Sequence, residues 1–460
     1  MRPTSLEDTI AAISTPLGEG GIGIVRVSGA KAVDIVRGIF CSPRGRDIKT
    51  SRARVFYGEV RDDDGAAIDE VLVHVMRAPH SYTREDVVEI NCHGGAGPLN
   101  AVLELVLIHG ARIAEPGEFT RRAFLNGRID LVQAEAVIDR IRARTRASLR
   151  AAATAASGAL SQSIHSLNTV LVDALARIEA SVDFPEEDLP DLVNEGLRSR
   201  LASARERMRT LLNTAETGRL YREGASVAIA GRPNVGKSSL FNALLRDARA
   251  IVTAEPGTTR DRIEEVITIA GVPVRLTDTA GIRSGAGEVE QIGMDVARES
   301  FKTADIVLFV CDVSQPLTAE DEQFSTDLRS IETPIILVLN KTDLVDEAAR
   351  VPWRVDFNAA CAVSAATGAG LQELESAIGR LLLGDMSIAP SQEMLTRAHQ
   401  RDSLRRAAKA LDGLLENFGA SPEFLSIDLR EALGALGEIT GETTSEDLLD
   451  VIFSSFCIGK

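Results

Sequence analysis

Three short motifs between Gly231 and Asp343 carry residue types that bind the parts of a nucleotide. The first fits the pattern GxxxxGKS and reads Gly231-Arg-Pro-Asn-Val-Gly-Lys-Ser238. Its glycines let backbone NH groups surround phosphates, while its lysine suits the β- and γ-phosphates and its serine hydroxyl suits Mg2+. The other two motifs are Asp278-Thr-Ala-Gly281 and Asn340-Lys-Thr-Asp343. Each motif alone is compatible with an ordinary turn, but the ordered set predicts a nucleotide switch.

The second and third motifs identify the nucleotide. Asp278 can hold the metal ion through water, and the NH group of Gly281 can contact the γ-phosphate. The carboxylate of Asp343 can accept hydrogen bonds from the ring NH and the amino group of guanine, whereas adenine offers neither donor there. Ser364 and Ala365 fit a last loop beside the base. The predicted GTP-binding residues are Asn234, Val235, Gly236, Lys237, Ser238, Ser239, Thr253, Ala254, Glu255, Pro256, Gly257, Thr258, Thr259, Asp278, Thr279, Ala280, Gly281, Asn340, Lys341, Thr342, Asp343, Ser364 and Ala365.

The segments around these motifs have the patterns of a parallel α/β sheet. The runs at 225–230, 274–278 and 335–339 have strand-like patterns, and residues 239–245 fit a helix that follows the first motif directly. This order of strand, loop and helix places the phosphates at a helix N-terminus, where the helix dipole favours anions. We therefore expect a P-loop GTPase domain with a doubly wound sheet over residues 221–382.

The remaining chain divides where its hydrophobic period changes. Its 460 residues are enough for about three domains. Residues 1–119 mix alternating strands, Gly-rich turns and an apolar helix over 98–109, which predicts an α+β domain. Helical spacing of apolar residues runs over 120–220 and resumes over 383–460. The expected fold is therefore α/β, with a helical domain that the GTPase domain interrupts.

One glycine-rich run offers a competing interpretation of the first segment. Gly18-Glu-Gly-Gly-Ile-Gly23 fits the dinucleotide pattern GxGxxG. A strand pattern follows it, so the pyrophosphate of a dinucleotide would have no helix N-terminus to bind. A turn between strands is the preferred interpretation, and a dinucleotide site is the weaker one.

Charge and cysteine content limit the other functions. The formal net charge of −16 argues against attraction of nucleic acid along the whole chain, so any RNA contact must be local. One candidate is Arg140-Ile-Arg-Ala-Arg-Thr-Arg146 with Arg150, although a solvated helix face with acidic neighbours is the favoured interpretation. The five cysteines lack CxxC spacing, so neither disulfides nor zinc are expected, and Cys311 and Cys361 fit buried strand positions.

The start of the chain has no apolar signal segment, and no apolar run reaches the roughly 18 residues of a membrane span. We therefore expect a cytoplasmic protein without a membrane partner.

Several segments outside the GTPase motifs resemble one family. They are Asp8 to Gly29, Pro116-Gly-Glu-Phe-Thr-Arg-Arg-Ala-Phe-Leu-Asn-Gly-Arg-Ile-Asp-Leu131, and the end of the chain, Phe456-Cys-Ile-Gly-Lys460. Together they look like the tRNA modification GTPase family MnmE, also called TrmE. The resemblance covers essentially the whole chain, and its Gly-Glu-Phe-Thr and Phe-Cys-Ile-Gly-Lys segments are more specific than the GTPase motifs.

The resemblance implies a specific function. Such proteins are GTP hydrolases that work with the flavoprotein MnmG (GidA) and add an aminomethyl or carboxymethylaminomethyl group to carbon 5 of the wobble uridine of certain tRNAs. They dimerise through an N-terminal domain that resembles tetrahydrofolate-binding domains and binds 5-formyl-tetrahydrofolate or a related one-carbon carrier. The resemblance therefore implies a homodimer, assembled with the flavoprotein as a heterotetramer.

Carried over by motif, the folate contacts are Arg26, Glu89, Arg128 and Lys460. Arg128 stands where the family usually has Lys, so the contact keeps its charge but changes its geometry. Without the family, Arg26 and Glu89 are ordinary surface charges. Cys457 is either a buried small hydrophobe, which the nearby Phe453 and Phe456 favour, or a functional thiol, which only the family motif favours.

Hydrolysis needs a helper because Ile282 follows the second motif, where many small GTPases carry a water-orienting Gln. The family answer is a potassium ion between the β- and γ-phosphates. Glu290 matches the family's water-orienting glutamate, although a solvent-facing acid is the favoured interpretation from the residues alone, and Lys237 completes the expected catalytic pair. The implied potassium ligands are Asn234, Thr253, Glu255 and Thr258, and the implied magnesium ligands are Ser238 and Thr259.

Two other functions fit parts of the chain. A ribosome-assembly GTPase of the Era or Der kind would bind RNA without modifying it, but such proteins lack the Gly-Glu-Phe-Thr and Phe-Cys-Ile-Gly-Lys segments. A folate-dependent transferase with a regulatory GTPase would place the whole active site in residues 1–119.

Overall fold

The computed structural model describes residues 8–50, 54–183, 193–248, 264–278, 301–345, 357–384 and 388–460. The chain forms two compact units, Met1–Ile138 with Gly434–Lys460 and Asp139–Leu433. The finer division into four segments stays a prediction. None of the helices in the described ranges is long and apolar enough to cross a membrane.

The first unit is built on a seven-stranded sheet with the order β3-β4-β5-β6-β2-β1-β7. Neighbouring strands run antiparallel, except for the parallel pair of β1 and β7. The strands are β1 (Ile10–Ile13), β2 (Gly20–Ser28), β3 (Phe40–Cys41), β4 (Val55–Arg61), β5 (Ala67–Met76), β6 (Val87–Gly94) and β7 (Arg112–Ile113). The glycine-rich run enters β2, so the prediction of a strand after it is confirmed.

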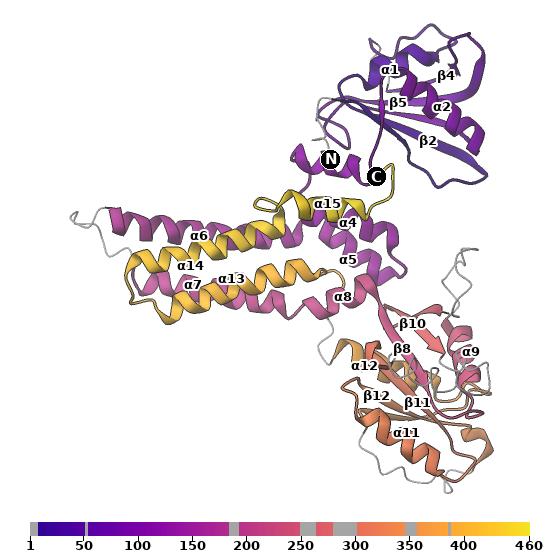
Figure 1. Ribbon diagram of the computed structural model, residues 1–460, viewed down its shortest axis with the longest axis vertical. Coiled ribbons are helices and arrows are strands. Elements are labelled where there is room, and N and C mark those ends of the chain that lie inside the picture. The colour runs from indigo at the N-terminus through magenta and orange to yellow at the C-terminus, as the bar shows by residue number, and fades with distance from the viewer. Residues whose placement is uncertain are drawn as a thin grey trace, which may run out of the picture. The chain divides into compact units, whose positions relative to one another are not determined.

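Two helices, α1 (Ala32–Ile39) and α2 (Ala96–Ile108), cover one face of this sheet (Figure 1). Val36 of α1 and Val102 of α2 pack with Val25, Val73 and other buried strand residues in one apolar core. The predicted helix over 98–109 is thus confirmed as α2. The first unit also contains α3 (Glu118–Leu125) and α15 (Glu446–Ser454).

The second unit has a set of helices that come before and after the strands of the GTPase sheet in the sequence. Gly158, with a φ of 82°, separates α5 from α6, so the predicted helical stretch is several helices. Ile164, Leu171 and Ile178 form the buried stripe of α6. The helices are α5 (Arg146–Ala156), α6 (Ala159–Asp183), α7 (Glu195–Leu212), α8 (Ala215–Glu223) and α13 (Ala398–Glu416), while α4 (Leu131–Arg142) and α14 (Pro422–Thr440) have residues in both units.

The second sheet has six strands in the order β13-β12-β11-β8-β10-β9. All neighbours are parallel except β9 and β10, which form an antiparallel pair. The strands are β8 (Ala225–Ala230), β9 (Glu264–Ile269), β10 (Val272–Asp278), β11 (Ile306–Asp312), β12 (Ile335–Asn340) and β13 (Ala359–Ala362). The predicted strands at 225–230, 274–278 and 335–339 are therefore confirmed.

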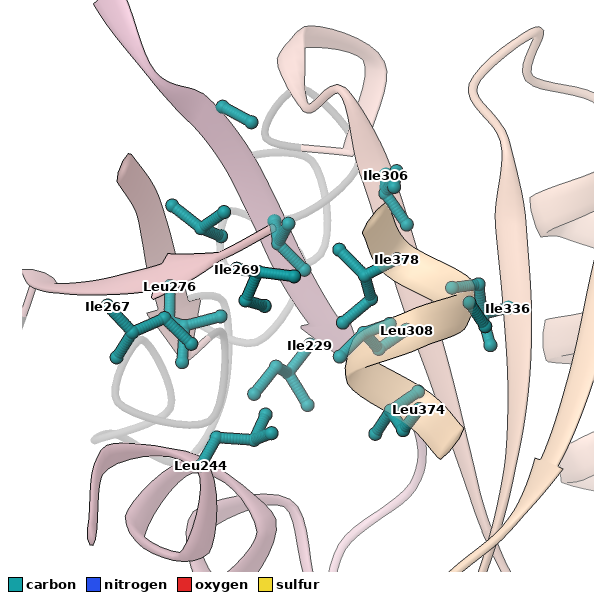
Figure 2. Packing of buried hydrophobic residues seen from close by; sticks show 14 of the residues in the cluster. Ile229, Leu244, Ile267, Ile269, Leu276, Ile306, Leu308, Ile336, Leu374 and Ile378 are labelled. Atoms are coloured by element: carbon teal, nitrogen blue, oxygen red, sulfur yellow. The ribbon is translucent and has the colours of Figure 1, made fainter. Parts of the chain in front are cut away.

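Helices pack on both faces of this sheet, as a doubly wound fold requires. On one face, Leu244 of α9 (Lys237–Ala248) and Ile378 of α12 (Leu371–Leu383) pack with Ile229 and Leu308 of the strands (Figure 2). On the other face, Leu328 of α11 (Ala319–Arg329) packs with buried strand residues that include Cys311. Both Cys311 and Cys361 are buried, as predicted.

Candidate functional site

The three nucleotide motifs come together at one edge of the second sheet. The first motif follows β8, Asp278 ends β10, and Asn340 ends β12. These strands are parallel, so their carboxyl ends lie at the same edge. Ligands of open α/β sheets bind outside this edge, where neighbouring connections leave in opposite directions. Here β8 lies between β10 on one side and β11 on the other.

The loop from Gly231 to α9 has the backbone of a phosphate cradle. Gly231 and Gly236 adopt φ values of 140° and 97°, and a Cβ atom at Gly231 would lie 2.4 Å from the carbonyl oxygen of Val310. Asn234 also takes a left-handed conformation, with a φ of 67°. The buried Lys237 donates from Nζ to the carbonyl oxygens of Gly231 and Arg232, both at 2.8 Å. The lysine thereby fixes the loop, and Ser238 and Ser239 are exposed in the first turn of α9.

The third motif is tied directly to this loop. The buried Asn340 donates from Nδ2 to the carbonyl oxygen of Val235 at 2.9 Å, and its Oδ1 accepts from the NH group of Ala365 at 3.1 Å. Lys341 donates from Nζ to the carbonyl oxygen of Asn234 at 2.9 Å. The structure therefore brings the phosphate loop, the Asn340 motif and the 364–365 loop together, although these residues are far apart in the sequence.

The predicted base-reading carboxylate lies beside this junction. Asp343 is exposed in the short 3-10 helix Thr342–Leu344, and its Oδ1 accepts from the Ser364 hydroxyl at 2.6 Å. Ser364 itself is buried. This hydrogen bond fixes the orientation of the Asp343 carboxylate through Oδ1. Recognition of a base edge needs a carboxylate that is positioned in this way.

Sequence reasoning missed Asp312, the last residue of β11. Its Oδ2 accepts from Nζ of Lys341 at 2.6 Å, and its Oδ1 accepts from the Ser314 hydroxyl at 2.6 Å. Burial by itself would raise the pKa of Asp312, but the hydrogen bonds from Lys341 and Ser314 hold that pKa below its usual range. An acidic residue at the carboxyl end of a buried apolar strand was the available signal.

Several predicted residues lie outside the described residues. They are Thr253, Ala254, Glu255, Pro256, Gly257, Thr258, Thr259, Thr279, Ala280, Gly281, Ile282 and Glu290. Asp278 is the last residue of β10, but its side chain is not among the parts that the structure describes. Of the predicted metal ligands, the structure therefore describes only Ser238 and Asn234.

A second cluster forms in the first unit around Arg26. Arg26 of β2 lies directly opposite Glu89 of β6, and its Nε is 2.8 Å from Oε1 of Glu89. The same guanidinium donates from Nη1 to the carbonyl oxygen of Gly459 at 3.0 Å. The Ser14 hydroxyl donates to that carbonyl oxygen at 3.1 Å. These bonds hold the penultimate residue of the chain against the sheet.

Two aromatic rings complete the cluster, and sequence reasoning missed both. The guanidinium carbon of Arg26 lies 5.7 Å from the ring centroid of Tyr82 and 5.6 Å from that of Phe119. The guanidinium carbon of Arg128 lies 4.8 Å from the Tyr82 centroid. These distances are in the range of attractive cation–π contacts. Tyr82 is fixed in turn by a 2.9 Å hydrogen bond between its hydroxyl and that of Thr120.

Lys460 lies close enough to this cluster for the charges of Arg26 and Glu89 to change its pKa. Burial and then the nearby Arg26 lower the pKa of Lys460, while Glu89 acts in the opposite direction. Arg26, Glu89, Arg128 and Lys460 therefore belong to one neighbourhood, as the predicted folate site requires, although their role as ligands stays a prediction.

The interpretation of Cys457 as a buried hydrophobe is wrong. Its side chain is exposed, while Phe453 and Phe456 are buried with Leu131 and Ile138 of α4 in the local core. Composition misled here because the helix α15 ends at Ser454, and the chain after it no longer follows the helical burial pattern. The exposed thiol keeps the second interpretation, a functional thiol, as a prediction.

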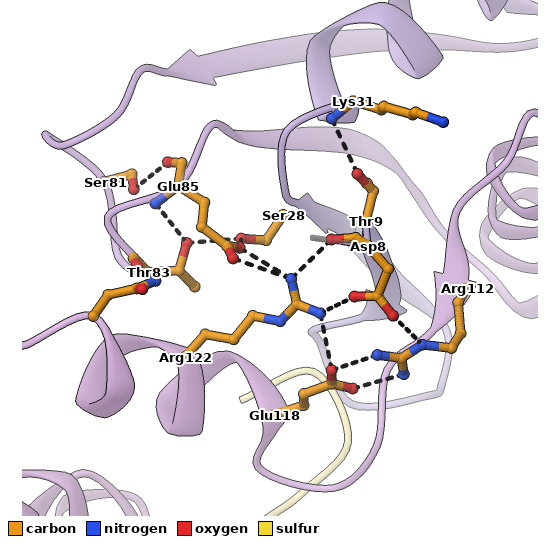
Figure 3. Close-up of polar contacts among 11 residues, drawn as sticks. Asp8, Thr9, Ser28, Lys31, Ser81, Thr83, Glu85, Arg112, Glu118 and Arg122 are labelled. Carbon is orange, nitrogen blue, oxygen red and sulfur yellow. Dashed lines mark hydrogen bonds and ion pairs between the residues drawn. The ribbon is translucent and has the colours of Figure 1, made fainter. Parts of the chain in front are cut away.

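A buried ion network positions α3 beside this cluster (Figure 3). Arg122 is only 2% exposed and pairs with Glu85 at 3.1 Å, with Glu118 at 3.1 Å and with Asp8. Arg112 joins Asp8 and Glu118 at 2.8 and 2.6 Å. Burial by itself would raise the pKa values of Asp8 and Glu118, but hydrogen bonds led by those from Arg112 hold both pKa values below their usual ranges.

The doubly wound sheet and the motifs at its edge define a GTP hydrolase. Family models agree with the rest of the chain: "MnmE helical domain" matches residues 131–457, and "GTP-binding protein TrmE N-terminus" matches residues 9–128. The chain is 48% identical over 468 residues to the tRNA modification GTPase MnmE of Heliobacterium modesticaldum, covering 98% of this chain and 99% of that protein. It is also 48% identical over 459 residues to that of Geobacter sulfurreducens, covering 99% and 100%. The chain belongs to the MnmE family of tRNA modification GTPases.

A solved structure of a variant of Aquifex aeolicus Era, bound to GDP and AlF4−, is 27% identical and covers 40% of this chain and 66% of that chain. Its TM-score is 0.30, so this likeness carries no argument about function. The ribosome-assembly alternative is not favoured, because relatives that share nearly the whole chain are tRNA modification GTPases.

Proposed function

We propose that this protein is a potassium-activated GTPase that works with the flavoprotein MnmG to add an aminomethyl or carboxymethylaminomethyl group to carbon 5 of the wobble uridine of certain tRNAs. The observation that carries the proposal is the match to MnmE proteins over nearly the full length of both chains. The cytoplasm, where tRNA is modified, is the proposed location. GTP, tRNA and the flavoprotein are the proposed partners.

The cluster around Arg26 is the proposed binding site for 5-formyl-tetrahydrofolate or a related carrier. Arg26, Arg128 and Lys460 supply positive charge for the glutamate carboxylates of folate, and Glu89 can accept hydrogen bonds from an amino-pyrimidine edge. Arg26 is already held by Glu89 and Gly459, so little of its side-chain freedom is lost on binding. The same N-terminal domain is the proposed dimer contact, and the homodimer joins the flavoprotein as a heterotetramer.

The proposed metal ions are magnesium and potassium. The Ser238 hydroxyl, in the first turn of α9, suits the oxygen preference of Mg2+, and Thr259 is its proposed companion. The amide oxygen of Asn234, with backbone carbonyls of Thr253 and Glu255 and the loop closed by Thr258, suits a weakly held monovalent ion. A potassium ion held by these residues would supply the positive charge that an arginine finger supplies in other GTPases. Glu290 is the proposed water-orienting residue, with Lys237 on the phosphates.

Nucleoside analysis of tRNA tests the reaction directly. In cells that lack the gene, wobble uridines that carry an aminomethyl or carboxymethylaminomethyl group at carbon 5 should disappear, and a plasmid copy of the gene should restore them. A copy with Lys237→Ala, which removes the phosphate-loop amine, should not restore them. Unchanged modified nucleosides in the deletion strain would refute the proposed function.

A further inference from the structure

The arginine-rich run after α4 forms a corner between two helices of the second unit. Arg140 and Arg142 lie in the last turn of α4, Arg144 lies in the connection, and Arg146 and Arg150 lie in α5. The prediction that these arginines share one helix face is wrong. The helix α4 ends at Arg142, and Thr145 caps a separate helix, α5, by accepting a hydrogen bond from the NH group of Ser148 at 3.0 Å. The corner nevertheless keeps all five arginines within eleven consecutive residues, and all five are exposed.

This corner has an unusual charge for the chain. Residues 139–172 contain five arginines, no lysine and a single acidic residue, Asp139, which gives a local formal charge of +4 in a chain of −16. Asp139 is already paired with Arg397 at 2.7 Å. The local charge is therefore not neutralised by the neighbouring sequence.

Four of the five arginines also have no acidic partner in space within the described part of the chain. Among the described residues, no carboxylate lies within the 4.0 Å ion-pair distance of Arg140, Arg144, Arg146 or Arg150. Exposed arginines elsewhere in this unit do have such partners: Arg198 pairs with Glu195 and Arg405 pairs with Asp402. The favoured interpretation from the sequence, a solvated face balanced by acidic neighbours, therefore fails for four of the five arginines within the described part of the chain.

The corner is also fixed to the GTPase sheet. The Thr145 hydroxyl donates to the carbonyl oxygen of Gly271, in the turn between β9 and β10, at 2.7 Å. Ala151 of α5 is buried in the apolar core of that sheet. Arg146 and Arg150 are one helical turn apart, about 6 Å along the axis. A polyanion would thus meet charges on a rigid frame and would not have to order a loop.

We propose that Arg140, Arg144, Arg146 and Arg150 form a docking surface for the phosphate backbone of tRNA. Guanidinium groups bind phosphates through paired hydrogen bonds, and such contacts orient a nucleic acid without reading its sequence. The identity of the polyanion rests on the proposed function, in which tRNA is the substrate. The surface would hold the substrate next to the GTPase sheet, because the hydrogen bond from Thr145 to Gly271 joins the corner to the strand pair of β9 and β10.

Fluorescence anisotropy of the full chain with a labelled tRNA transcript that carries wobble uridine tests this surface. The variant combines Arg144→Gln, Arg146→Gln and Arg150→Gln. The control combines Arg198→Gln, Arg401→Gln and Arg405→Gln, which removes the same charge from exposed arginines with acidic partners. Both leave the Thr145 cap of α5 unchanged. Both should therefore have the GTP turnover and the thermal unfolding temperature of the wild type.

We expect the variant to bind tRNA at least about tenfold more weakly at 0.1 M salt, while the control stays within about twofold of wild type. The slope of log K against log salt should fall in magnitude by about one for each lost phosphate contact, hence by two to three in the variant. Equal affinity and slope in variant and control would overturn the proposal, and so would absence of tRNA binding by the wild type at low salt. A variant that binds tRNA normally but no longer captures the purified flavoprotein would assign the surface to an acidic protein instead. None of these results depends on nucleoside analysis, so failure of the docking surface is distinguishable from failure of the proposed function.

Discussion

Replacement of Arg26 by alanine is the sharpest test of the folate site. This side chain is 14% exposed and contacts Glu89, the carbonyl oxygen of Gly459 and the rings of Tyr82 and Phe119. The substitution therefore removes a proposed ligand and also a bond that holds the end of the chain, where Lys460 lies. Both effects weaken folate binding, and neither changes a residue of the second unit, which contains the GTPase sheet.

The size of the effect follows from these contacts. A hydrogen bond from a charged donor contributes about 1.5–3 kcal/mol, which corresponds to roughly tenfold to 150-fold in Kd. The guanidinium is already oriented by Glu89 and Gly459, so the upper part of this range applies. Arg26→Lys keeps the charge but loses the planar fork, so its affinity should lie between those of the wild type and Arg26→Ala.

Titration calorimetry with 5-formyl-tetrahydrofolate measures these affinities. Arg61→Ala is the matched control, because Arg61 is an exposed arginine of the same sheet and pairs with Glu59 at 2.9 Å. GTP turnover should be unchanged in all three variants. An Arg26→Ala protein with wild-type affinity would remove Arg26 from the site, and no binding by the wild type would remove the one-carbon role altogether.

Four further outcomes are expected. Exchange of sodium for potassium at equal ionic strength should raise GTP turnover by at least about tenfold, and Asn234→Ala should lose this response while still binding nucleotide; equal rates in both salts would refute potassium activation. Asp343→Asn should weaken GTP binding and improve binding of xanthosine triphosphate, measured by competition, and unchanged GTP affinity would exclude Asp343 as the base reader. Glu290→Ala should lower the turnover number by about a hundredfold with little change in nucleotide affinity, whereas a normal turnover number would leave Glu290 as a surface acid. Arg122→Met should destabilise the first unit by about 3–5 kcal/mol at pH 7, seen as faster amide hydrogen exchange in β1 and α3. The folded-state pKa values of Asp8 and Glu118 are lowered, so the contribution of the network to the free energy of unfolding is present above about pH 5 and is lost as the pH falls through those pKa values. The difference in stability between the variant and the wild type should therefore become smaller in acid. A difference that does not change with pH would contradict this assignment.

The GTPase half of the site could be predicted because its information is local. Each motif lies at the carboxyl end of a predicted strand. Parallel strands bring their carboxyl ends to one edge of the sheet, independently of the structure of the other segments. The same reasoning missed Asp312, because an acidic residue after a strand acquires its meaning only through Lys341, which lies after another strand. The helical stretch was harder to divide, since apolar spacing continues across Thr145, which caps the start of α5, and across the left-handed Gly158, which separates α5 from α6.

The cluster around Arg26 shows why the other half needed the family resemblance. Arg26 and Glu89 become neighbours only through the pairing of β2 with β6, and no local pattern fixes which strands pair in a seven-stranded sheet. The carbonyl oxygen of Gly459 reaches Arg26 across 433 positions of sequence. Gly459 can take this place because its φ is 91°, and a Cβ atom there would lie 2.4 Å from the carbonyl oxygen of Ile13. The terminal Gly-Lys pair is therefore needed for its fit as well as its charge: any other residue before Lys460 would push the end of the chain away from Arg26.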